Sequence, residues 1–72
     1  MQELKIGAKY RHFKGSIHRV LNIAVHTETE EDLVIYQSLD SGKVWARPLQ
    51  MFLEEVDHEK IKQKYRFELI EE

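Results

Sequence analysis

Short runs of strand-forming residues between isolated glycines constrain the fold of this chain more than any other feature. Gly7, Gly15 and Gly42 each stand alone, and glycine readily takes the positive φ angles that tight turns need. The runs 17–26 and 33–39 are dense in β-branched and aromatic residues, which favour strands. The sequence therefore predicts short strands joined by tight turns.

The run 17–26 has the alternation of a half-buried strand. The polar segment 27–32 that follows it is predicted to be a solvent-exposed loop. One face of the strand is expected to carry Ile17, Arg19, Leu21, Ile23 and Val25, and the other His18, Val20, Asn22, Ala24 and His26.

A β-hairpin is predicted to join 33–39 to 44–47. The connecting residues 40–43 include a glycine for the turn. Because side chains on a strand alternate between its two faces, Trp45 and Arg47 share a face whatever the length of the turn.

Helix is expected only in the turn that begins at Pro48. Proline suits the first position of a helix and keeps the preceding residue extended, so 48–52 is predicted as a helical turn. The tail has two interpretations, because 65–70 alternates like a strand whereas 57–64 is rich in helix formers. The alternation favours a final strand.

The 72 residues are expected to form a single small domain, 1–72. Several short strands with tight turns predict a mainly all-β fold, either a small antiparallel SH3-like barrel or a strongly bent sheet, in which the edges are protected. One short helical turn after Pro48 completes this fold. Such a fold carries no activity with it.

The composition excludes several classes of protein. Without cysteine, the chain has no disulfide, thiol nucleophile or cysteine-ligated zinc. The longest apolar run, 33–36, has four residues, far fewer than the roughly 20 that span a bilayer. The start of the chain also lacks the apolar stretch of a secretory signal. We therefore expect a cytoplasmic protein with no membrane partner.

The sequence contains no pattern that predicts catalysis. The glycines form no phosphate-binding loop, and the serines do not lie on a nucleophile elbow. The histidines follow no recognised spacing of metal ligands. We therefore predict that the protein is not an enzyme and has no catalytic residue, cofactor or metal.

Opposite charges gather in the two parts of the chain. Residues 1–26 have a net charge of +4 and residues 27–72 a net charge of −6. The sequence pI near 6.1 is lower than that of most strong nucleic-acid binders. Binding of RNA or single-stranded DNA by the basic N-terminal hairpin is the alternative function, and its candidate residues are Lys9, Arg11, Lys14 and Arg19.

Four segments of the chain resemble a known family. They are YRHFKGSIHRVL from Tyr10, AVHTETEEDLVIYQSL from Ala24, VWARPLQMFLEEV from Val44 and RFELI from Arg66. Together they are similar to the bacterial domain-of-unknown-function family numbered sixteen fifty-three, over most of the chain. The resemblance implies a small, stand-alone bacterial protein, and it carries over no activity and no catalytic residue.

The strongest candidates for a binding site are aromatic and cationic residues. Aromatic rings and arginine are enriched at binding hot spots, because they combine a large contact area with a polar group. The alternative is that the rings form the core and Arg47 lies over Trp45. We predict a face that binds a protein segment or a second copy of the chain, and its candidate residues are Trp45, Arg47, Tyr36, Tyr10 and His12.

Overall fold

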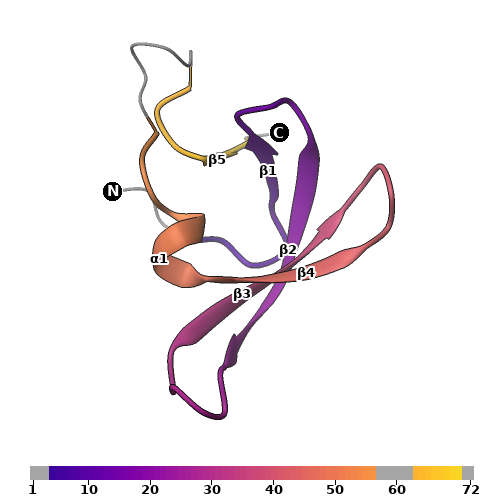
Figure 1. Cartoon of the computed structure of the whole chain (residues 1–72). Helices are drawn as coiled ribbons and strands as arrows, with labels where there is room; N and C mark the ends of the chain where they lie inside the picture. Colours follow the sequence, from indigo (N-terminus) through magenta and orange to yellow (C-terminus); the bar gives the residue numbers. More distant parts are fainter. Residues whose placement is uncertain (1–3, 57–62, 71–72) are drawn as a thin grey trace.

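The computed structural model describes residues 4–56 and 63–70, and it consists of one antiparallel sheet with a short helix beside it (Figure 1). The five strands lie in the order β4-β3-β2-β1-β5. The elements are β1 (Lys9–His12), β2 (Ile17–Val25), β3 (Asp32–Ser38), β4 (Val44–Pro48), α1 (Leu49–Phe52) and β5 (Phe67–Leu69).

The predicted fold class is confirmed: the described residues are mainly strand, with one short helix directly after Pro48. The sheet is not closed, because β4 and β5 form its two edges. The chain thus adopts the bent sheet and not the closed barrel. Pro48 itself ends β4 with an extended backbone, and the helix begins one residue later than predicted, at Leu49.

A β-bulge in β2 decides which side chains face the core. The pairing between β2 and β3 shifts between Val20 and Asn22, so Leu21 is the extra residue and the alternation reverses after it. Val20 pairs with Tyr36 before the bulge, and Ile23 pairs with Val34 after it. The expected uninterrupted alternation over 17–26 is therefore wrong.

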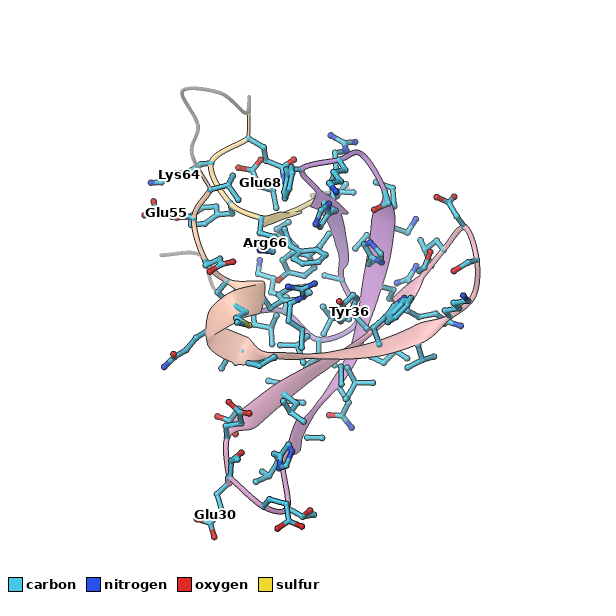
Figure 2. All side chains as sticks on the ribbon, viewed as in Figure 1. Glu30, Tyr36, Glu55, Lys64, Arg66 and Glu68 are labelled. Carbon is cyan, nitrogen blue, oxygen red and sulfur yellow. The ribbon has the colours of Figure 1, made fainter. Side chains whose placement is uncertain are left out.

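The loop after β2 is built around His26. Its Nδ1 accepts hydrogen bonds from the backbone N–H groups of Glu28 at 3.0 Å and Thr29 at 3.3 Å. Glu30 takes a positive φ of 61° and lies in the turn of the β2–β3 hairpin, where Figure 2 labels it. The ring of His26 thus stabilises the predicted exposed loop.

The core lies on one side of the sheet and is largely aromatic. Phe52 of α1 stacks on Phe67 of β5, with ring centroids 4.2 Å apart and an interplanar angle of 6°. Tyr10 of β1 meets Phe52 edge-on at 5.3 Å. This cluster joins the helix to the first and last strands, and the buried apolar residues are Tyr10, Val20, Val34, Tyr36, Phe52 and Phe67.

The predicted final strand is confirmed at Phe67–Leu69, which pairs with β1. An isolated bridge between Glu55 and Tyr65 precedes it. The nearby ion pair between Lys64 and Glu55 spans 3.5 Å, and both residues are labelled in Figure 2. Of the segment 57–64, for which helix was the other interpretation, residues 57–62 lie outside the described part of the chain.

Candidate functional site

A pocket of about 380 Å³ opens on the core side of the sheet, between the β1–β2 turn and the β3–β4 turn. Its volume lies within the range of about 300 to 1,000 Å³ that is typical of small-molecule sites. We call it the Trp45 pocket. All five strands contribute to it, and its aromatic wall consists of Tyr36, Trp45 and Phe67.

Strand register brings these side chains to one face. Tyr36 pairs directly with Trp45, and Arg47 follows two positions later on the same strand. His18 of β2 pairs in the same way with Ser38 of β3. Directly paired residues of an antiparallel sheet point to the same side, so the hairpin of β3 and β4 adds its side chains to those of β1 and β2.

Arg47 is held in place by two aromatic rings. Its Nε donates a hydrogen bond to the hydroxyl of Tyr36 at 3.3 Å, and its guanidinium carbon lies 5.8 Å from the ring centre of Phe67. Trp45 beside it is 48% exposed, with Lys43 Nζ 5.9 Å from its ring centre. The pocket therefore combines a fixed cation with an accessible indole ring.

Two histidines form the polar side of the Trp45 pocket. The ring centres of His12 and His18 lie 6.4 Å apart. Nδ1 of His12 accepts the backbone N–H of Lys14 at 3.2 Å, and Nε2 of His18 lies 3.0 Å from the hydroxyl of Ser16. Nδ1 of His18 is buried and has no hydrogen-bond partner among the described residues.

Burial lowers the pKa of both histidines below the ordinary value of 6.5. For His12, nearby positive charges lower the pKa further: His18, Arg66, Arg47 and Lys14. For His18, Asp40 opposes the effect of burial and Arg47 adds to it. Both rings are therefore neutral at pH 7, and each offers one donor and one acceptor.

We expect the thermal midpoint to fall as the pH decreases from about 8 to about 5, because the unfolded chain binds protons at these histidines more tightly than the folded chain. The stability that they contribute is fully present above the unfolded pKa of 6.5 and is lost as the pH falls toward the folded pKa. Thermal melts of the wild type and of a variant carrying His12→Gln and His18→Gln measure this effect. The variant should depend less on pH, and an equal dependence in both proteins would contradict the expectation.

Four of the five residues predicted for ligand binding line the Trp45 pocket together: Trp45, Arg47, Tyr36 and His12. Tyr10, the fifth, does not line this pocket. The side chain of Tyr10 is 0% exposed, because it packs against Phe52 in the core. Its hydroxyl accepts the backbone N–H of Lys5 at 2.8 Å.

The four cations predicted for nucleic-acid binding lie on two different faces. Lys9 pairs with Arg19 across β1 and β2, and Arg11 follows on the same face, which is turned away from the core. We call this the outer face. Glu68 pairs with Arg11 there. Lys14 instead lines the Trp45 pocket, so the structure does not bring the four together.

Three serines also line the pocket and were not predicted to do so: Ser16, Ser38 and Ser41. Ser38 stands two positions after Tyr36 on β3, so the alternation of the strand was a signal that could have found it. Ser16 and Ser41 lie next to turn glycines. These two serines reach the pocket because of the way in which the two turns fold over the sheet. No sequence pattern predicts this arrangement of the turns.

Within the described residues, no helix is long and apolar enough to cross a membrane. Comparisons with curated proteins and with solved structures find no match to the chain. A family model described as "Protein of unknown function (DUF1653)" matches residues 8–69, a span that contains every residue of the Trp45 pocket. This match confirms the resemblance seen in the sequence, and the chain belongs to the DUF1653 family of proteins of unknown function.

Proposed function

We propose that this protein is a non-enzymatic binding module that holds a short segment of another protein in the Trp45 pocket. The observation that carries the proposal is the convergence of Trp45, Arg47, Tyr36 and His12 on one pocket. A tryptophan and an arginine that lie side by side are the residue types most enriched at binding hot spots. The proposal includes self-association, in which the bound segment belongs to a second copy of this chain.

The rigid placement of these groups supports the proposal. Arg47 is fixed by the hydroxyl of Tyr36 and the ring of Phe67, and Trp45 lies within a paired strand. A binding face that is already ordered loses little conformational entropy when a ligand arrives. The only tryptophan of the chain is 48% exposed, although burying its ring would stabilise so small a core. This exposure is consistent with a surface that becomes covered when a ligand binds.

The position of Trp45 on an edge strand suggests how a segment would lie. Among the described residues, β4 pairs only with β3. In an antiparallel sheet, alternate residues of an edge strand direct their N–H and C=O groups outward, where an added strand can pair with them. A segment lying along β4 would place every second side chain on the side of the Trp45 pocket.

Binding of nucleic acid is the weaker candidate. The outer face offers Lys9, Arg11 and Arg19, but Glu68 lies opposite Arg11. Arg19 also donates a hydrogen bond to the carbonyl oxygen of Gly7 at 2.6 Å. Phosphate recognition relies on several cations that act together, and Lys14 is on the other side of the sheet.

Selection of random peptides displayed on phage, with the full chain as bait, tests the proposal. We expect selected peptides to bind Trp45→Ala at least about tenfold more weakly than the wild type, because hot-spot residues contribute 2 kcal/mol or more, about thirtyfold in affinity. Met51→Ala is the matched control, because Met51 is similarly exposed, at 51%, but lies on α1. Failure to select any peptide, or equal binding to the wild type and Trp45→Ala, would contradict the proposal.

A further inference from the structure

We infer that the Trp45 pocket recognises an oxyanion on the bound segment, a carboxylate or a phosphoryl group, next to an apolar side chain that rests on Trp45. This inference depends on the proposed function, since it names the chemistry of the segment held there. It follows from the charges, the hydroxyl groups and the rings that line the pocket.

The charged residues that line the pocket are positive. Lys14 and Arg47 both line it, and no aspartate or glutamate does. Among the described residues, neither cation forms an ion pair, whereas Lys64 and Arg66 do so with Glu55 and Glu54. Because a partly desolvated cation gains most from an oxyanion that accepts its N–H groups, an anionic group is the complement that this pocket lacks.

The serine hydroxyls are arranged as donors. The oxygen of Ser38 accepts the backbone N–H of Ser41 at 3.2 Å, and the oxygen of Ser41 accepts the backbone N–H of Lys43 at 3.3 Å. A hydroxyl that already accepts such a bond keeps its own hydrogen for another acceptor. Within residues 4–56 and 63–70, neither of these hydroxyls donates a hydrogen bond. An oxyanion has several lone pairs and can therefore accept hydrogen bonds from both hydroxyls.

The two histidines add donors that depend on pH. Because Nδ1 of His12 accepts the N–H of Lys14, the hydrogen of the neutral ring lies on Nε2. A bound anion would favour the protonated form of His12 and His18 and so oppose the burial that lowers their pKa. The charged groups that act on these rings are Lys14, Asp40, Arg47 and Arg66. Affinity for an anion should therefore increase as the pH falls toward about 6.

The aromatic wall explains why the ligand carries an apolar group as well. The ring of Trp45 is accessible at the rim of the pocket, since this residue is 48% exposed. Phe67 and Tyr36 lie deeper, where they hold Arg47. Tyr36 is labelled in Figure 2. An apolar group beside the anion would cover Trp45 while the anion meets Arg47.

Titration of Trp45 fluorescence with small probes tests the inference directly. Phenylacetate and phenyl phosphate represent the two anions, and benzyl alcohol is the neutral control. We expect both anions to bind at least about tenfold more tightly than benzyl alcohol, since hydrogen bonds between charged groups are stronger than those to a neutral hydroxyl. Phenylacetate should bind more tightly at pH 6 than at pH 8, and His12→Gln should reduce this difference.

Lys14→Ala should weaken the binding of both anions, whereas Arg11→Ala on the outer face should not change it. Equal binding of the neutral and anionic probes, or an equal effect of Arg11→Ala, would overturn the inference. Peptides that depend on Trp45 but tolerate amides in place of their acidic residues would also overturn it, and they would leave the binding module intact. A protein that binds the small anions but selects no peptide would contradict the proposed function alone.

Discussion

Replacement of Phe67 with alanine is expected to leave the chain largely unfolded at room temperature. Phe67 is 1% exposed and stacks on Phe52 with ring centres 4.2 Å apart. Substitution of a buried phenylalanine by alanine destabilises a protein by about 3 to 5 kcal/mol. A chain of this size rarely has more than about 3 to 5 kcal/mol of stability from one core, so the loss is comparable with the total.

Urea denaturation followed by circular dichroism measures this effect. Phe67→Leu keeps most of the apolar volume and should unfold at an intermediate urea concentration. Met51→Ala, on the exposed side of α1, should stay within about 0.5 kcal/mol of the wild type. If Phe67→Ala unfolds at nearly the same urea concentration as the wild type, then β5 does not anchor the core and the wall of the Trp45 pocket is not fixed as described.

Replacement of Arg47 with alanine is expected to weaken the binding of phenylacetate and of selected peptides at least about tenfold, because the ligand loses a hydrogen bond from a charged group. The fold should survive. The substitution removes the hydrogen bond to the hydroxyl of Tyr36 and the contact with Phe67, which together contribute about 1 to 2 kcal/mol.

Arg47→Lys separates charge from geometry. Lysine keeps the positive charge but lacks the planar group that can hold Tyr36 and an oxyanion at the same time. We therefore expect only partial recovery of binding by fluorescence titration, with a thermal midpoint near that of the wild type. Two outcomes would show that Arg47 has a structural role only: unfolding of Arg47→Ala, or unchanged affinity in Arg47→Ala.

The sequence predicted the part of the site that depends on strand alternation alone. Trp45 and Arg47 share a face because side chains alternate along any strand, and this holds for every turn length between β3 and β4. The helical turn after Pro48 was predictable for a similar reason, because the ring of proline restricts its own backbone and that of the residue before it. The structure confirms the helix at Leu49–Phe52.

The pairing between strands was not predictable in the same way. The bulge at Leu21 depends on the register of β2 against β3, and no pattern within 17–26 indicates it. Tyr10 and His12 share a face of β1, as alternation requires. Their different exposure arises because α1 packs on Tyr10, a contact between residues far apart in the sequence.

The most direct test of the central claim is to follow the amide, indole and guanidinium N–H signals of the nitrogen-15-labelled full chain by NMR during titration with phenylacetate. A binding site in the Trp45 pocket predicts saturable shifts of the Trp45 indole N–H, the Arg47 Nε–H and the amides of Ser38 and Ser41, with Lys9 and Arg19 unchanged. Shifts confined to the outer face, or no saturable shift at all, would contradict the claim.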